Sequence, residues 1–96
     1  MASMIKSFRD KETEAVYKGY QHPKFPPESI RGAKKKLQML DAACDLRDLK
    51  IPLSNSLEAL KRDREVQWSI RINKQWRVCF VWADNNAYDV EIVDYH

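Results

Sequence analysis

Glycine, proline and cysteine are scarce in this sequence, and no long hydrophobic run occurs in it. Two glycines and four prolines in 96 residues are too few to form a flexible linker between domains. The longest apolar run, Val78–Ala83, is far shorter than the roughly 20 residues that a helix needs to cross a bilayer. The first residues also lack the features of a secretory signal peptide. We therefore expect a cytoplasmic protein with no membrane-spanning segment.

The cysteines give no indication of a metal site or a disulfide. Cys44 and Cys79 are far apart in the sequence and lie among apolar residues, with no CxxC motif and no histidine near either. Zinc sites are typically built from closely spaced cysteine and histidine ligands, which are missing here. We expect two buried free thiols, no bound metal and no cofactor.

Length and composition indicate one small folded domain that spans residues 1–96. A chain of this size buries about two-thirds of the surface that its unfolded form exposes, which is enough for a single core. Hydrophobic residues make up 44% of the chain and charged residues 32%, a balance typical of folded soluble proteins. Neither a second domain nor a disordered chain is expected.

Basic residues are concentrated in one part of the chain. The formal net charge is only +3, but residues 61–77 contain six lysines and arginines against two acidic residues. The last fifteen residues contain four acidic residues and no lysine or arginine. A concentrated basic surface attracts a polyanion even when the whole protein is only mildly basic. The same residues could instead solvate one face of a sheet, and composition does not decide between the two.

Two helices are predicted in the first half of the chain. Asp10 can cap a short helix that ends at about Tyr20, and the prolines of residues 21–27 then interrupt the helical pattern. The last of these prolines can begin a second helix, in which apolar residues recur every three or four positions and predict one buried stripe. The stripe consists of Ile30, Ala33, Leu37, Leu40 and Cys44. The basic residues of this helix, Lys34 and Lys35 among them, fall mainly outside the stripe, either as a solvated face or as an auxiliary surface for RNA.

A period of two in the second half of the chain predicts antiparallel strands. The expected strands are Met4–Phe8, Leu57–Lys61, Val66–Ile72, residues 75–82 and Ala87–Val93, with turns at residues 73–74 and 84–86. These elements predict an α+β domain in which two N-terminal helices pack on one face of a mainly antiparallel sheet. Tyr88, Val90 and Ile92 would face the helices. Arg71 and Arg77 would lie on the opposite, open face.

Four segments of the chain match the pattern of one known family. They are Leu57–Phe80, which contains WSIRIN and WR, the closing VEIVDYH, the opening MIKSF and the segment KLQMLDAA. Together they resemble the HigB family of plasmid-maintenance killer toxins in the RelE/ParE superfamily, over nearly the whole chain. The resemblance implies a RelE-like microbial RNase fold and a type II toxin that cleaves mRNA in the ribosomal A site. It also implies a helix-turn-helix antitoxin of the HigA type as partner, and contact with promoter DNA only through the toxin-antitoxin complex.

The resemblance also implies a site for RNA cleavage at the end of the chain. Such cleavage requires a base for the 2′-OH, cations for the phosphate and an acid for the 5′ leaving oxygen. His96 would be the general acid or base, and Tyr95 would stack on a nucleobase or pass a proton. Asp94 would either orient His96 or neutralise a neighbouring arginine. Arg77 would clamp the phosphate, because its planar fork suits phosphate oxygens, and Lys61 would stabilise the developing charge.

Other basic residues are expected to contact RNA, whereas the histidine of the proline loop is not expected to take part in function. The predicted RNA contacts are Arg64, Arg71, Lys74, Lys34 and Lys35. His22, in the proline loop, would be an exposed bystander. Strict alternation in the last strand puts Asp94 and His96 on the core side, so we expect a bulge or the end of pairing after Val93.

Two positions depart from the family pattern. Arg62 stands where the family has a glycine, and a side chain at positive φ would strain that turn, so either the turn differs here or Lys61 is displaced. Glu58 stands where some relatives have a histidine, so a mechanism that needs a second imidazole there cannot operate.

Two other functions stay open. A ParE-like protein of the same fold would poison DNA gyrase without catalysing a reaction, although the terminal Tyr95 and His96 argue against this interpretation. A degenerate member, which the change at Arg62 suggests, would keep only its binding to the antitoxin or to RNA.

Overall fold

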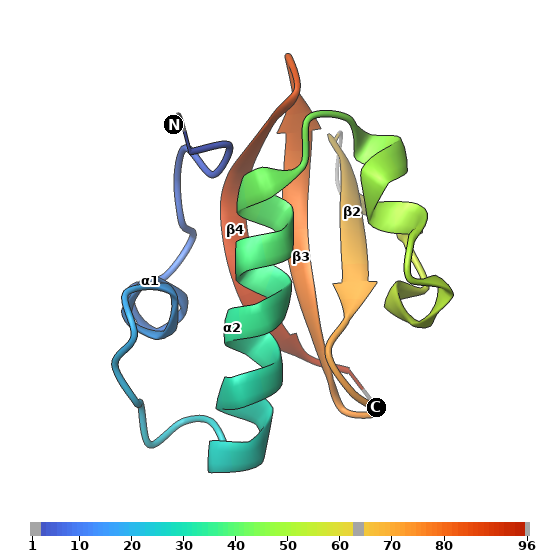
Figure 1. The fold of residues 1–96 in the computed structure, drawn as a ribbon. Coiled ribbons are helices and arrows are strands. Elements are labelled where there is room, and N and C mark those ends of the chain that lie inside the picture. The colour runs from blue at the N-terminus through green and yellow to red at the C-terminus, as the bar shows by residue number, and fades with distance from the viewer. Residues whose placement is uncertain (1–2, 63–64, 96) are drawn as a thin grey trace.

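A computed structural model describes residues 3–62 and 65–95 and shows two helices packed on a four-stranded antiparallel sheet (Figure 1). The elements in order are α1 (Lys11–Tyr17), α2 (Pro27–Ala42), the 3-10 helices η1 (Leu46–Lys50) and η2 (Leu53–Asn55), and the strands β1 (Glu58–Arg62), β2 (Glu65–Arg71), β3 (Trp76–Ala83) and β4 (Asn86–Asp94). The strands lie in the order β1-β2-β3-β4. The predicted α+β class is confirmed.

Local chemistry explains where the helices begin and end. The Asp10 carboxylate accepts a hydrogen bond from the Thr13 N–H at 2.8 Å and caps α1, as predicted. α1 ends at Tyr17, earlier than predicted, because the chain turns away through Gly19 at φ +99°, a conformation that favours glycine. α2 begins at Pro27, where the missing N–H of proline is not needed. None of the described helices is both long enough and apolar enough to cross a membrane.

The apolar stripe of α2 packs on β3 and β4 and forms the core with them. The buried members of the stripe are Ile30, Ala33, Leu37 and Leu40, as predicted. The expected fifth member, Cys44, is exposed, and that prediction was wrong because α2 ends at Ala42 and the chain then turns into η1. Cys79 is a buried free thiol, as predicted.

Lys36 binds within the fold and is not part of a solvated basic face. Its ammonium group donates to the side-chain oxygen of Asn55, a fully buried residue whose amide donates to the Leu49 carbonyl at 3.1 Å. Burial, and to a smaller extent the charge of Lys35, lowers the pKa of Lys36. This contact joins α2 to η1 and η2.

The N-terminal segment lies along β4 and is fixed there by Asp41, in the last turn of α2. Isolated parallel bridges at Ile5 and Phe8 replace the predicted strand. The Asp41 carboxylate accepts hydrogen bonds from the Ser3 hydroxyl, the Ile5 N–H at 3.1 Å and the Tyr17 hydroxyl at 2.8 Å. Burial alone would raise the pKa of Asp41, but these hydrogen bonds outweigh it and hold the pKa below its ordinary value. The same carboxylate raises the pKa of Tyr17.

We expect Asp41→Asn to lower the free energy of unfolding by about 1–3 kcal/mol near neutral pH, because an amide cannot accept all the hydrogen bonds that the carboxylate accepts. The pKa of the folded wild type is lowered from 3.8, so the stability that this group contributes is lost as the pH falls below that value. Urea unfolding near pH 7 and near pH 3 should therefore show a smaller difference at the lower pH. Asp84→Asn, in an exposed turn, is the matched control and should change stability by less than about 0.5 kcal/mol. Equal losses in the two variants would contradict the prediction.

A bulge interrupts β4 in its middle. The register of β3 and β4 shifts between Cys79 and Val81, and the facing residue Asp89 has a positive φ of 52°. Ala87 is therefore fully buried, whereas Tyr88, which pairs with Val81, is half-buried. The prediction that Tyr88 faces the helices was wrong, because the bulge reverses the alternation on its N-terminal side.

Candidate functional site

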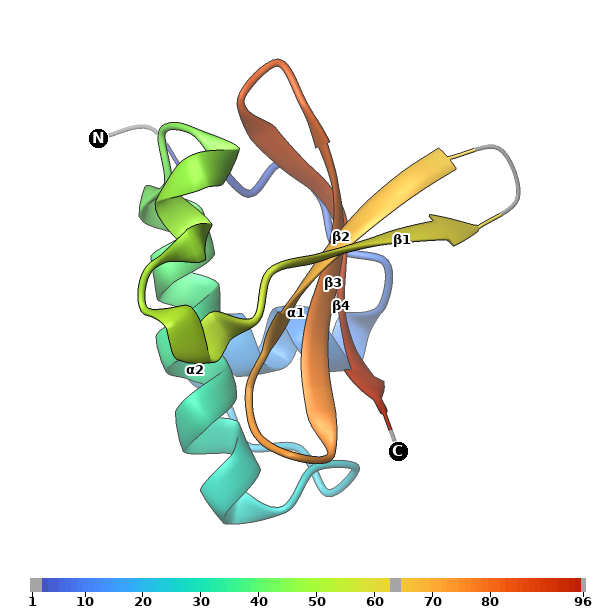
Figure 2. The same ribbon diagram turned by 90° about the vertical axis from the view of Figure 1, so that its right-hand side faces the viewer.

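Arg77, the central cation of the predicted site, lies on the face of the sheet away from the helices (Figure 2). Figure 2 shows α1 and α2 on one side of the sheet, while the far ends of β1 and β2 lean away from them on the other side. On this second face Arg71 pairs with Arg77, and Ser69 pairs with Cys79. The prediction that this face is open was wrong for its centre, because Gln67, Ser69 and Cys79 are buried there.

Arg77 is held firmly at the centre of this face. Its Nε–H donates to the Ser69 hydroxyl at 2.9 Å, and Nη2 donates to the backbone carbonyls of Ser56 and, at 3.3 Å, of Ser69. The residue is only 7% exposed, so the prediction that it projects freely from an open face was wrong. Nη1 makes no hydrogen bond with the residues that the structure describes.

Ser56 reaches Arg77 through an uncommon backbone conformation. It ends η2 in the left-handed region, at φ 45° and ψ 57°, and its N–H donates to the Leu53 carbonyl at 3.0 Å. Sequence reasoning missed both serines of this site. Ser69 could have been found, because it alternates with Arg71 on one face of β2, but no pattern in the sequence predicts the conformation of Ser56.

Tyr95 and Glu58 also contact Arg77. The centroid of the Tyr95 ring lies 5.7 Å from the guanidinium carbon, within the range of a cation-π contact. The Tyr95 N–H donates to the Gln75 carbonyl, which ties the segment after β4 to the start of β3. A Glu58 carboxylate oxygen lies 4.0 Å from Nη2 of Arg77, and this side chain is 54% exposed. The structure thus brings Arg77 and Tyr95 together, with an exposed carboxylate beside them.

Asp94 lies on the other face of β4. It pairs with Trp76, and its carboxylate accepts a hydrogen bond from the Gln75 side chain at 3.3 Å. The ladder runs in register as far as this pair, so the bulge or end of pairing expected after Val93 does not occur in the described part of β4. Asp94 and Tyr95 therefore project to opposite faces of the sheet.

The predicted RNA-contact residues fall into two groups. Arg71 and Lys74 are exposed at the end of β2 and in the turn that follows, close in the sheet to Arg77. Lys34 and Lys35 lie on α2, on the helix side of the sheet (Figure 2). The sheet separates the two groups, so they do not form one continuous surface.

Three of the predicted residues cannot be placed as side chains. Arg64 and His96 lie outside the described residues, and so does the side chain of Lys61. The backbone of Lys61, in β1, pairs with Val66 of β2. Arg62 is the last residue of β1 and pairs with Glu65, and the turn that the missing glycine was expected to strain lies outside the described residues.

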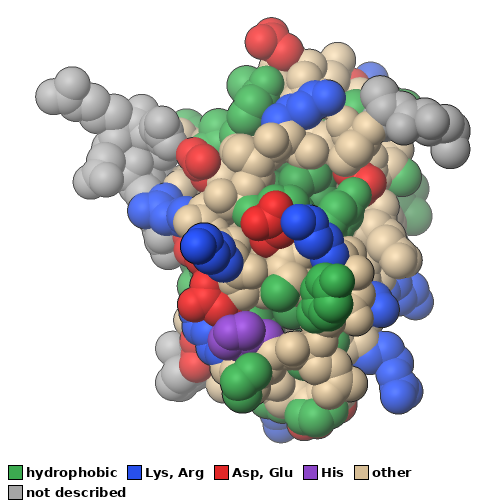
Figure 3. Space-filling view, turned by 90° about the vertical axis from the view of Figure 1, so that its left-hand side faces the viewer, with side chains coloured by type: hydrophobic (Ala, Val, Ile, Leu, Met, Phe, Trp, Pro, Cys, Tyr) green, Lys and Arg blue, Asp and Glu red, His purple; other side chains and the backbone are tan. Residues whose placement is uncertain are grey.

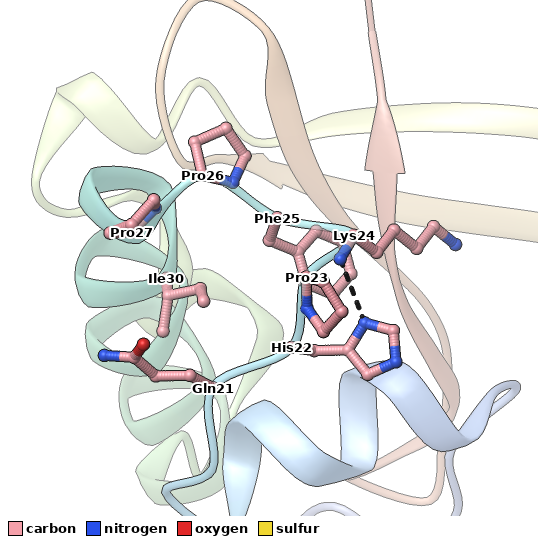
Figure 4. Close-up of a pocket in the computed structure, with 8 residues that line it drawn as sticks. All are labelled: Gln21, His22, Pro23, Lys24, Phe25, Pro26, Pro27 and Ile30. Atoms are coloured by element: carbon pink, nitrogen blue, oxygen red, sulfur yellow. Dashed lines mark hydrogen bonds between the residues drawn. The ribbon is translucent and has the colours of Figure 1, made fainter.

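The proline loop forms a separate cleft of about 520 Å³. Figure 4 shows the His22 ring beside the loop backbone, where its Nδ1 accepts a hydrogen bond from the Lys24 N–H at 3.1 Å. The ring also lies 6.1 Å from that of Phe25. His22 is half-buried rather than fully exposed, which corrects the prediction, and its contacts stabilise the loop.

Charged side chains on the face that carries α1 do not gather into a basic patch. Figure 3 shows lysine and arginine interspersed there with aspartate and glutamate. Lys18 and Glu14 form one such pair, at 3.5 Å within α1. Across residues 3–62 and 65–95, no group of three or more histidine, cysteine, aspartate or glutamate side chains is arranged to hold a metal ion.

Similarity to known proteins extends over most of the chain. Residues 6–96 match the family described as the RelE-like toxin of type II toxin-antitoxin system HigB. The chain is 40% identical over 85 residues to Toxin HigB-1 of Vibrio cholerae serotype O1, which covers 88% of this chain and 90% of that protein. It is 31% identical over 93 residues to Endoribonuclease HigB of Proteus vulgaris, which covers 97% of this chain and 100% of that protein. An uncharacterized protein of Haemophilus influenzae is 34% identical over 84 residues, or 83% of this chain and 80% of its own.

Proposed function

Because this chain belongs to the HigB-like family of RelE-like toxins of type II toxin-antitoxin systems, we propose that it is an endoribonuclease that cleaves translated mRNA in the ribosomal A site. The contact between Arg77 and Tyr95 is the observation that carries this proposal. A guanidinium and an aromatic ring so close together can receive a phosphate and a nucleobase of one RNA segment. His96 follows Tyr95 directly in the sequence and supplies a group that titrates near neutral pH.

In the proposed reaction, the ribose 2′-oxygen attacks the adjacent phosphorus and the 5′-oxygen of the next nucleotide leaves. The 2′-OH loses its proton to a base, and the leaving oxygen gains a proton from an acid. His96 performs one of these transfers. Nη1 of Arg77 binds the phosphate oxygen on which negative charge develops, and Lys61 adds positive charge. The products are a 2′,3′-cyclic phosphate, or a 3′-phosphate after hydrolysis, and a 5′-hydroxyl.

The exposed cations near Arg77 would bind the RNA backbone on either side of the cut. Arg71 and Lys74 continue the positive charge from Arg77 into the turn between β2 and β3. Lys34 and Lys35 lie across the sheet and could contact only a different RNA segment, such as the ribosomal RNA around the A site. The isolated toxin should therefore be weak on free RNA, because the ribosome supplies much of the binding surface.

Membership of a type II system implies an antitoxin partner. In the proposal, this partner is a helix-turn-helix protein of the HigA type that holds the toxin inactive in the cytoplasm. The toxin reaches promoter DNA only through the antitoxin, as part of the complex that represses their own transcription.

Dependence on translation is the sharpest test of this function. We expect the wild-type protein, expressed without its antitoxin, to cut a reporter mRNA at positions in phase with its codons. A matched reporter in which only the start codon is altered should stay intact, because it does not enter the A site. Mapping of 5′ ends across both transcripts measures the effect. Equal cutting of the two reporters would rule out ribosome dependence, and intact transcripts together with DNA damage would indicate a gyrase poison instead.

A further inference from the structure

Ser69 is fully buried in β2 and accepts two of the hydrogen bonds that Arg77 donates. Its hydroxyl accepts from the Nε–H at 2.9 Å, and its backbone carbonyl accepts from Nη2 at 3.3 Å. These two nitrogens form one edge of the planar guanidinium. Ser69 therefore binds a whole edge of the guanidinium and fixes the plane in which the third nitrogen, Nη1, lies.

The register of the strands explains why a serine suits this position. Ser69 pairs with Cys79, so Arg77 is its diagonal neighbour on β3, two residues along the same face. Diagonal neighbours in an antiparallel pair lie roughly 7–8 Å apart, a distance that only long side chains can bridge. A small hydroxyl leaves room for the guanidinium to lie across β2, whereas a larger side chain would occupy that room.

Burial makes the orientation of Arg77 a property of the free protein. A buried charge is costly unless its donors are hydrogen-bonded, and Ser69 supplies two acceptors before any RNA is bound. An arginine side chain has several rotatable bonds, so a free guanidinium would sample many orientations. A donor contributes most to catalysis when it already points to the place where charge develops, because no reorganisation is then needed during the reaction.

The other contacts of Arg77 cannot fix its orientation in the same way. The Ser56 carbonyl binds Nη2 alone, and a guanidinium held at one nitrogen can pivot about it. The Tyr95 ring, 5.7 Å from the guanidinium carbon, attracts the charge without directing a particular N–H. Among the residues that the structure describes, only the Ser69 hydroxyl binds Nε.

We propose that Ser69 is a positioning residue for RNA cleavage, whose hydroxyl holds Arg77 in the orientation in which Nη1 meets the phosphate. The inference rests on the proposed endoribonuclease function and deepens it. Ser69 does not touch the RNA, because its side chain is fully buried, and no bond or proton changes at its hydroxyl. Its effect on the rate passes entirely through Arg77.

Single-turnover cleavage of mRNA on programmed ribosomes, measured across ribosome concentrations, tests this role. Ser69→Ala should lower the maximal rate by about 10- to 10²-fold, the cost of a misplaced reacting group, and leave the ribosome concentration at half-maximal rate unchanged. The double variant Ser69→Ala/Arg77→Ala should be no slower than Arg77→Ala, because without the arginine the hydroxyl has nothing to orient. A serine with a merely structural role would slow both backgrounds by the same factor.

Ser29→Ala is the matched control for the loss of a buried hydroxyl. Ser29 is also buried and its hydroxyl also accepts a side-chain hydrogen bond, from Asn73 at 3.0 Å, but it belongs to α2, on the other side of the sheet (Figure 2). This variant should lose stability in thermal unfolding, as Ser69→Ala does, yet keep the wild-type rate. Ser69→Thr retains the hydroxyl and should keep most of the rate.

The outcomes separate the positioning role from the nuclease function. If the wild type cleaves but a folded Ser69→Ala keeps its rate, or if its loss multiplies with that of Arg77→Ala, the positioning role is overturned and the nuclease function stands. If Ser69→Ala does not fold at the assay temperature, Ser69→Thr decides, and a loss as large as that of Arg77→Ala would overturn the role. If the wild type does not cleave translated mRNA, both proposals fail.

Discussion

Replacing His96 with alanine is expected to slow mRNA cleavage on programmed ribosomes by about 10²- to 10⁴-fold, the contribution of a well-placed general acid or base. An imidazole suits this role because its ordinary pKa lies near neutral pH, so it can both hold and release a proton. The preceding residue, Tyr95, donates a backbone hydrogen bond to the Gln75 carbonyl. This bond does not involve the His96 side chain and should persist in the variant. Single-turnover rates separate this chemical effect from ribosome binding.

The second histidine of the chain provides the control for this substitution. His22→Ala removes an imidazole from the proline loop, where it accepts a hydrogen bond from Lys24, and should leave the cleavage rate unchanged. If His96→Ala cut mRNA as fast as the wild type at the same positions, His96 would have no part in the reaction. Loss of cleavage in His22→Ala alone would move the catalytic imidazole to the proline loop.

Replacing Arg77 with alanine should lower the cleavage rate by about 10²- to 10³-fold, because it removes a preorganised donor from the phosphate. Arg77→Lys should be almost as slow. The donors of an ammonium group share one nitrogen, whereas the planar guanidinium spreads its donors over three and uses only Nε and Nη2 for the serines. Rates with saturating ribosomes measure the loss.

The same substitution should also destabilise the fold, which an exposed phosphate clamp would not do. Without the guanidinium, the buried Ser69 hydroxyl loses its donor, at a cost of about 1–3 kcal/mol for a buried group left unsatisfied, and the carbonyl of the exposed residue Ser56 loses its contact with β3. Chemical denaturation of Arg77→Ala beside Arg71→Ala, its exposed neighbour across the strand pair, separates the two roles. Equal stability of the two variants would show that Arg77 is not a structural anchor.

Much of the fold could be predicted because periodicity reports which residues share a buried face. The three-and-four spacing identified α2 and its stripe, and strict alternation identified β2 and β3 with the turn between them. These patterns depend on neighbouring residues alone. The placement of Arg71 and Arg77 on one face followed from the same alternation.

Features that depend on distant contacts could not be read from those patterns. Alternation places Arg77 on a face but does not say that Ser56, from outside the sheet, covers it. The bulge at Asp89 places Tyr88 on the other face of the sheet, and no glycine or proline in the sequence predicts it. Cys44 continues the helical spacing past the end of α2, where spacing no longer has meaning.

The order of the elements along the chain also has a consequence for the assembly of the site. Tyr95 follows β4, whereas the carbonyl that anchors Arg77 comes from Ser56, before β1. Before β4 has been synthesised, the chain already contains Arg77 and the Ser56 carbonyl that binds it, but it lacks the Tyr95 ring. Arg77 and the ring that faces it therefore come together only after β4 has paired with β3 and closed the sheet.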